Sequence, residues 1–186
     1  MSTILSSWLS WRWAAAGEKA GPPPALHYPL SPAPRVAALG RRFAPARGVV
    51  SLERWSARKL EELEPEALAA SPADLFLVAA LRRAGLLRLP ALAFPLLALL
   101  GPEDEPLGEE QLDRLWEHFG LPVRQQALGR DGRLLAYDCE AAAGFHIVHP
   151  CFGWPGMALW DEPCACGDPA PLLIPAGRAR AATAML

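Results

Sequence analysis

Several residue types and patterns are scarce in this chain of 186 residues. It contains no asparagine and only two lysines among 18 basic residues, a bias that we attribute to coding preference and give no functional weight. Charge of one sign is scarce as well, because the formal net charge is −2 at pH 7. Bulk electrostatics therefore do not indicate a nucleic-acid-binding protein.

A long uninterrupted hydrophobic run is missing too. The most apolar stretch, 86–100, is shorter than the about 20 residues that a bilayer span requires, and it contains Arg88, Pro90 and Pro95. The N-terminus has no positive charge before its first apolar residues, and Trp and Arg residues interrupt any signal-peptide core. The sequence predicts a cytoplasmic protein without a membrane span, whose four cysteines are reduced thiols or metal ligands rather than disulfides.

Three catalytic signatures do not occur in the sequence. It has no G-x-x-x-x-G-K-[ST] phosphate loop, no G-x-G-x-x-G dinucleotide fingerprint and no G-x-S-x-G nucleophile elbow. Acidic residues do gather between 103 and 110, just before and within an expected helix. The helix dipole favours acids at such a place, so we interpret them as a solvated capping cluster rather than an acid/base pair.

Proline, in contrast, is abundant, at 20 residues or roughly twice the usual frequency of about 5%. With 52% hydrophobic and 20% charged residues, the composition is globular and excludes wholesale disorder. Seven of the prolines lie before residue 50, where they forbid long helices. We therefore expect a partly ordered proline-rich arm over 1–50 and a single domain over 51–186, with a Cys/His-rich loop end at 139–176.

The arm carries two features that bear on partners. Its tryptophans, Trp8, Trp11 and Trp13, are too apolar to remain in water, so we expect them to cover the main domain or to dock on a protein partner. Its densest basic segment, 35–47, has no aromatic ladder on which bases could stack. We interpret that segment as a solvated surface and predict no nucleic-acid partner.

Two helices are expected in the N-terminal half. Ser51 is a candidate N-cap for a helix over 52–63. A second helix is bracketed by Ser71 as N-cap, Pro72 at the first helical position and Gly85 beyond the end. These signals predict a helical N-terminal half packed beside a sheet.

The C-terminal half shows the patterns of a strand, a helix and then antiparallel strands. Leu112, Leu115, Trp116 and Phe119 have helical spacing, and Gly120 ends that helix. The expected elements are a strand over 93–100, a helix over 109–119, a hairpin of 121–128 with 133–139, a strand over 145–149, and extended pieces at 157–160 and 172–175. This order predicts an α/β or α+β fold with a small mixed sheet.

The cysteines are the clearest chemical signal. Cys139, Cys151, Cys164 and Cys166 all fall in the last third of the chain, with His146 and His149 among them. Structural zinc takes four tetrahedral thiolate or imidazole ligands. The segment Cys164-Ala165-Cys166-Gly167 forms a tight knuckle that could supply two of them, and Cys139 with one histidine could supply the others. We predict zinc on Cys139, His146, Cys164 and Cys166.

Alternatives remain open at this stage. His149 or Cys151 could replace His146 as the fourth ligand. Cys139 could be an ordinary core thiol, the commonest environment of a free cysteine. Cys164 and Cys166 could instead form a redox pair, because the disulfide of a Cys-x-Cys pair closes a strained ring and is easily reduced.

Residues 97–176 also resemble a known family. The segments "LALLGPEDEPLGEEQLDRLWEHFGLPVRQQ" and "LLAYDCEAAAGFHIV" are similar to the late part of the large domain of phenylacetate-CoA ligase-like adenylate-forming enzymes. Gly144-Phe145-His146 stands where that family has Gly-Leu-His. Some members of the family hold a structural zinc on a cysteine that matches Cys139 and on a knuckle that matches Cys164 to Gly167.

The chain departs from the family where the catalytic groups are concerned. Gln125 and Gln126 stand in the region where the family has its adenylate-binding Tyr/Thr/Glu motif. The family's phosphate loop and catalytic C-terminal domain have no counterpart in this chain. Ala142 stands where the family has its zinc-binding histidine. The resemblance therefore implies a degenerate and truncated relative, a non-catalytic intracellular accessory protein. Alternatives are a minimal adenylating or acyl-transfer enzyme and a thiol-based redox or persulfide carrier.

Overall fold

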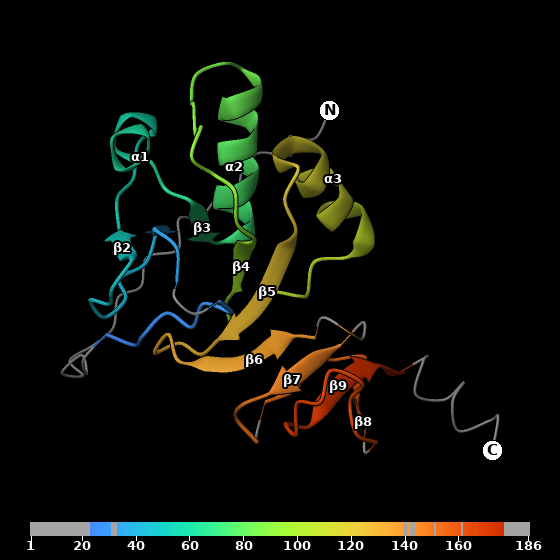
Figure 1. Ribbon diagram of the computed structural model, residues 1–186. Coiled ribbons are helices and arrows are strands. Elements are labelled where there is room, and N and C mark those ends of the chain that lie inside the picture. The colour runs from blue at the N-terminus through green and yellow to red at the C-terminus, as the bar shows by residue number, and fades with distance from the viewer. Residues whose placement is uncertain are drawn as a thin grey trace, which may run out of the picture.

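A computed structural model describes residues 23–30, 33–139, 141, 144–150, 152–160 and 162–176. Within these residues one nine-stranded sheet, ordered β2-β1-β3-β4-β5-β6-β7-β9-β8, carries three helices (Figure 1). The predicted mixed α/β fold is confirmed. The tryptophans Trp8, Trp11 and Trp13, as well as Ala142 and Cys151, lie outside the described residues.

The first five strands are parallel and form one half of the sheet. They are β1 (Val36–Leu39), β2 (Val49–Leu52), β3 (Ala67–Ala70), β4 (Leu96–Leu100) and β5 (Val123–Leu128). Their order, 2-1-3-4-5, is that of a doubly wound sheet, in which the direction of winding reverses between β1 and β3. The reversal requires the β1–β2 connection to cross the face opposite the helices, because parallel crossovers are right-handed.

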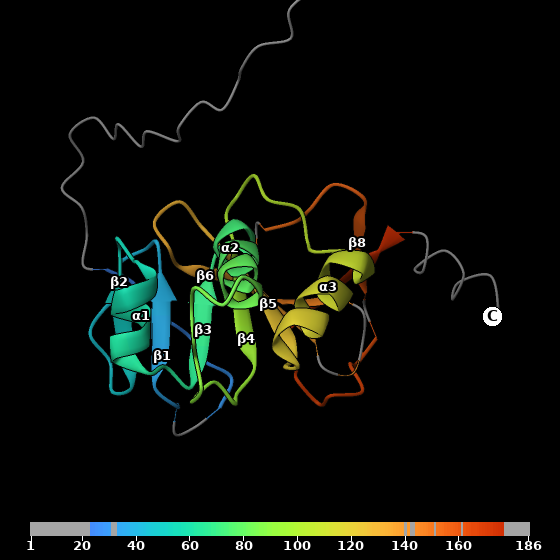
Figure 2. The same ribbon diagram turned by 90° about the horizontal axis from the view of Figure 1, so that it is seen from above.

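The three helices cover one face of these parallel strands (Figures 1 and 2). They are α1 (Ala57–Leu63), α2 (Pro72–Arg83) and α3 (Glu109–Phe119). The Ser71 side chain accepts a hydrogen bond from the Asp74 N–H at the start of α2, as predicted for an N-cap. Gly120 ends α3 in the left-handed conformation (φ +67°), which glycine adopts without steric cost.

Two apolar clusters lie on the two faces of the parallel half. On the helix face, Leu60, Leu75 and Leu115 pack against alternate strand residues such as Leu68 and Leu96. On the other face, Leu26, Tyr28 and Phe43 cover the intervening strand residues. The central strands β1, β3 and β4 are therefore buried on both sides, which explains why they are continuous apolar runs without polar alternation.

The remaining strands, β6 (Leu134–Asp138), β7 (Phe145–Ile147), β8 (Met157–Trp160) and β9 (Leu172–Pro175), are antiparallel. They extend the sheet beyond β5 across the lower part of Figure 1. The predicted hairpin of β5 and β6 is confirmed. Gly144 is required where β7 meets β9, because a Cβ atom there would lie 2.4 Å from the carbonyl oxygen of Leu173.

Three predictions differ from the structure in the N-terminal half. Residues 36–39 and 49–50, assigned to the arm, belong to β1 and β2. The apolar side chains of β1 are fully buried between its neighbours, and β2 pairs in parallel with β1 at the edge of the sheet. The helix expected from residue 52 starts instead at Ala57, after Ser56 as its N-cap. Because β3 also lies here, a helical N-terminal half is not confirmed.

The apolar stretch at 86–100 ends in β4, a buried central strand, as expected from its length. Among the described residues, no helix is both long enough and apolar enough to cross a bilayer.

Candidate metal centre

Four side chains from three parts of the antiparallel half meet at one point. The ligand atoms of Cys139, His146, Cys164 and Cys166 all lie within 4.8 Å of one another. The sulfur atoms of Cys139 and Cys164 are 3.3 Å apart, and Nε2 of His146 is 3.1 Å from the Cys166 sulfur. These are the four residues that the sequence analysis assigned to a metal.

The β6–β7 hairpin positions the first two ligands. Tyr137 in β6 pairs with His146 in β7, so their side chains share one face of the sheet. Cys139 lies two residues after Tyr137 and therefore points to the same face. The Cys139 N–H donates to the Gly144 carbonyl at 2.9 Å, which extends the pairing up to the ligand itself.

The other two ligands lie on the loop between β8 and β9. The Gly167 N–H donates to the Cys164 carbonyl at 3.0 Å, which closes a tight turn around Cys166. Gly167 has φ +82°, a conformation that residues with a Cβ atom rarely adopt. The predicted knuckle is therefore present, and both of its sulfur atoms face the hairpin.

His146 is held in the tautomer that a metal ligand needs. Its ring is 1% exposed, and its Nδ1 lies 3.0 Å from the carbonyl oxygen of Ala170. A carbonyl oxygen can only accept, so Nδ1 carries the proton and Nε2 presents a lone pair to the sulfur cluster. Metal-binding histidines typically donate their second N–H in this way, which fixes the orientation of the ring.

Tyr137 and Asp168 make further contacts that stabilise the knuckle. The Tyr137 hydroxyl donates to the Asp168 carboxylate, which also accepts the Ala170 N–H at 2.8 Å. The Tyr137 ring lies against the His146 ring, with 5.4 Å between their centroids. Asp168 and Tyr137 thus connect the knuckle to His146 and to Ala170, whose carbonyl orients the histidine ring.

These contacts shift the pKa values of both partners. Burial, followed by the hydrogen bond to Asp168, raises the pKa of Tyr137 well above its usual range, so its hydroxyl keeps its proton. The same hydrogen bond lowers the pKa of Asp168, which remains a carboxylate. The donor and acceptor roles of the pair are therefore fixed at neutral pH.

The environment of Cys164 favours its thiolate form. The Cys166 backbone N–H lowers the pKa of Cys164, and the Cys139 and Cys166 side chains lower it further. Backbone N–H groups of Ala141 and Asp168 lie 3.4 Å from the sulfur atoms of Cys139 and Cys166, respectively. Thiolate is the form of cysteine that binds metals.

The donor set fits a tetrahedral ion that prefers sulfur and nitrogen. Zinc bonds of about 2.3 Å to sulfur and 2.0–2.1 Å to nitrogen give tetrahedron edges of about 3.8 Å between sulfurs and about 3.6 Å between sulfur and nitrogen. The observed contacts of 3.3 and 3.1 Å differ from these edges by about half an ångström, an adjustment that side-chain rotation can supply. The cluster can hold a metal ion.

The sequence left His149 and Cys151 as alternatives to His146 for the fourth ligand. His149 is exposed and does not belong to the cluster, although its backbone N–H donates to the Leu135 carbonyl. Cys151 lies outside the described residues. Cys139 is 8% exposed and packs with Leu172 and Ile174, as expected for a cysteine in the core. Its sulfur atom also faces the other ligands.

The sequence analysis missed Tyr137 and Asp168. They are 31 residues apart, and no spacing rule links a strand tyrosine to an aspartate after a knuckle. The only available signal was the face alternation of β6, which places Tyr137 beside Cys139.

Comparison of the chain with protein-family models and with curated proteins finds no family and no relative that matches it. The assignment of the site therefore depends on its geometry and its donor chemistry.

Proposed function

We propose that this chain is a non-catalytic intracellular accessory protein in which a structural zinc ion on Cys139, His146, Cys164 and Cys166 holds the antiparallel half together. One observation carries the proposal, the convergence of three sulfur atoms and one imidazole nitrogen within 4.8 Å. A Cys₃His set is one of the usual donor sets of structural zinc sites. A cytoplasmic location agrees with cysteines that remain reduced.

The structural role follows from the number of ligands. Four protein ligands complete a tetrahedral shell and leave no position for water or substrate, so hydrolytic or Lewis-acid chemistry is not part of the proposal. Bound zinc would cross-link the β6–β7 hairpin to the β8–β9 loop. Because such a site does not exist in an unfolded chain, metal binding and folding of this half would be coupled.

We also propose a distant relationship to phenylacetate-CoA ligase-like adenylate-forming enzymes. Its support is the sequence correspondence at Gly144-Phe145-His146 and at the knuckle, together with the positions of Cys139 and Cys164 in one cluster. The non-catalytic role is supported by Gln125, whose amide is occupied by the backbone: its Oε1 accepts the Leu107 N–H at 2.6 Å. A structural side chain thus stands in the region of the family's adenylate-binding motif.

Metal analysis of the full chain tests the zinc proposal. Protein purified without chelator should contain one zinc per chain, and each of the variants Cys139→Ser, Cys164→Ser and Cys166→Ser should lose it. The matched control is His149→Ala, which removes an exposed histidine outside the cluster and should retain one zinc. Substoichiometric zinc, with every thiol titratable under native conditions, contradicts the proposal.

The accessory role is tested separately by ATP-dependent pyrophosphate exchange. A panel of carboxylic acids, phenylacetate included, should give no exchange above background with the zinc-loaded full chain. Exchange with any of them would assign the chain to adenylating or acyl-transfer enzymes and would leave the metal result untouched.

Thiol redox chemistry is a second candidate because of one contact. The Cys139 and Cys164 sulfurs lie 3.3 Å apart, so this pair is placed to form a disulfide. Two thiols would transfer two electrons to a small disulfide such as oxidised glutathione, with release of two glutathione thiols. Rapid thiol–disulfide exchange by the zinc-free chain, lost in Cys139→Ser, favours this candidate, whereas inert thiols in a stoichiometric zinc protein exclude it.

A further inference from the structure

A second group of charged side chains lies outside the metal centre. A cavity of about 410 Å³ is lined by Gly40, Arg41, Arg42, Glu53, Arg54 and Arg130. Its lining therefore contributes four guanidinium groups and one carboxylate. Its volume is in the range of about 300–1,000 Å³ that is typical of small-molecule sites.

The cavity lies where doubly wound sheets bind ligands. Gly40 to Arg42 directly follow β1, Glu53 and Arg54 directly follow β2, and Arg130 follows β5. These are the carboxyl ends of parallel strands, beside the reversal of winding between β1 and β3. Residues distant in sequence reach one place because parallel strands end at the same edge of the sheet.

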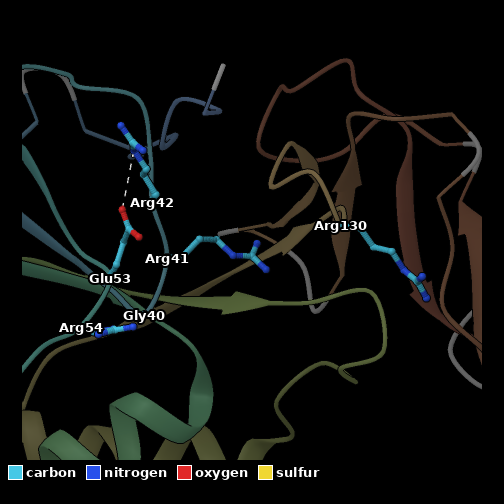
Figure 3. A pocket seen from close by; sticks show the side chains of 6 residues that line it. All are labelled: Gly40, Arg41, Arg42, Glu53, Arg54 and Arg130. Carbon is cyan, nitrogen blue, oxygen red and sulfur yellow. Dashed lines mark ion pairs between the residues drawn. The ribbon is translucent and has the colours of Figure 1, made fainter. Parts of the chain in front are cut away.

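The arginines are not equivalent. Arg41 extends from the end of β1 towards the hairpin that carries Arg130, away from the Arg42–Glu53 pair (Figure 3). Arg41 is partly buried, and this desolvation lowers its pKa, while the charge of Asp104 acts in the opposite direction. A partly desolvated guanidinium interacts more strongly with an incoming anion than a fully hydrated one.

Two of the other arginines are engaged in exposed ion pairs. Arg42 lies 3.8 Å from Glu53, and Arg130 lies 3.1 Å from Glu103 and points away from Arg41. The side chains of both pairs are more than half exposed, and such pairs are weak. An anion with more charge than a carboxylate can therefore displace Glu53 or draw Arg130 into the cavity by rotation of its side chain.

We infer that this arginine cavity binds a small anion that carries a diphosphate group. Guanidinium forks match phosphate oxygens with paired hydrogen bonds, and several forks from separate loops favour a ligand with several negative charges. None of the lining residues is aromatic, so the cavity offers no stacking surface for a base. The diphosphate itself, rather than an RNA strand, is the recognised chemistry, and this inference is independent of the proposed zinc site.

Calorimetric titration of the full, zinc-loaded chain with inorganic pyrophosphate tests the inference. At low salt, we expect one saturable site that weakens as salt is added. Arg41→Gln should weaken binding at least tenfold, and the exposed Arg54→Gln provides a second variant that should weaken it if Arg41→Gln does not fold. The matched control, Arg58→Gln, removes an arginine of the α1 surface pair with Glu62 and should bind as the unaltered chain does.

Further ligands separate the possible outcomes. ADP that binds at least as tightly as pyrophosphate, with the same dependence on Arg41, supports the inference and adds a nucleoside to the ligand. Sulfate that binds as well as pyrophosphate means an adventitious ion only and overturns it. Absence of saturable binding, equal binding by Arg41→Gln and Arg58→Gln, or binding of single-stranded RNA without pyrophosphate also overturns it. Zinc content should be unchanged in every variant.

Discussion

The parallel strands β1–β5 and the antiparallel strands β6–β9 belong to one sheet but differ in how they are covered. In the parallel half, three helices bury a continuous cluster of leucines, and a second cluster closes the opposite face. Among the described residues, the buried cluster around the ligand cysteines of the antiparallel half consists of Cys139, Leu172 and Ile174, and a separate cluster includes Phe145, Ile147 and Trp154. The first half can be stabilised by apolar burial, whereas the ligand end of the second has little apolar surface to bury.

The contrast explains why a metal site would occur at this end of the sheet. Short strands that lack helical cover bury too little area to offset the entropy of ordering their loops. A tetrahedral ion bound to the cluster would connect the β6–β7 hairpin to the β8–β9 loop and would supply the missing free energy at one point. Four predictions test this division, beginning with the largest effect.

Loss of the metal should destabilise the antiparallel half and leave the parallel half folded. Cys139→Ser should remove a binding free energy on the order of 10–16 kcal/mol, the range of structural zinc sites. Hydrogen exchange should then become fast in β6, β7 and β9 while β3 and β4 remain protected. His149→Ala is the control, and equal protection of both halves without zinc would contradict the division.

A cavity in the leucine cluster should have the opposite pattern. Leu75 in α2 is fully buried, so Leu75→Ala should lower the free energy of unfolding by about 2–5 kcal/mol, as measured by urea denaturation. Zinc content should not change. Leu77→Ala in the same helix is the control, because that side chain is 50% exposed and should cost within about 0.5 kcal/mol.

Crowding between β7 and β9 should destabilise the antiparallel half. In Gly144→Ala the new Cβ would lie 2.4 Å from the Leu173 carbonyl, so the strands must shift, at a cost of about 1–3 kcal/mol. Denaturation monitored by Trp154, which packs on Phe145, reports this loss. Gly153→Ala has open space around the added methyl group and is the control. Equal stability of the two variants would show that β7 and β9 do not meet as described.

Removal of one hydroxyl should give the smallest effect. Tyr137→Phe removes the hydrogen bond to Asp168, so we expect zinc to bind about tenfold more weakly, the lower end of the range for residues that orient ligands. Competition with a chromophoric chelator measures this change. Tyr28→Phe also removes a buried hydroxyl bond, to the Pro95 carbonyl in the parallel half, and should leave zinc affinity unchanged. A similar zinc affinity of the two variants would show that the Tyr137 hydroxyl does not orient the ligands.

Local signals predicted the elements that are specified locally. Ser71 at the start of α2 and Gly120 at the end of α3 act within one turn of a helix. The helices α2 and α3 were therefore predicted close to their observed bounds. In contrast, β1 and β3 were missed, because VAAL and ALAA are short apolar runs that could equally belong to helices. They become strands because neighbouring strands satisfy their backbone hydrogen bonds on both sides.

The sequence alone identified Cys139, Cys164, Cys166 and a histidine as candidate metal ligands, since thiol and imidazole groups carry their metal chemistry wherever they are placed and their clustering is visible in the chain. Only the tertiary structure selected His146 over His149, because strand pairing decides which histidine is buried beside Cys139. It also brought Tyr137 to Asp168 and the arginines to one edge of the sheet. These contacts join residues far apart in the chain, and their geometry is set by strand order and register, which no local pattern encodes.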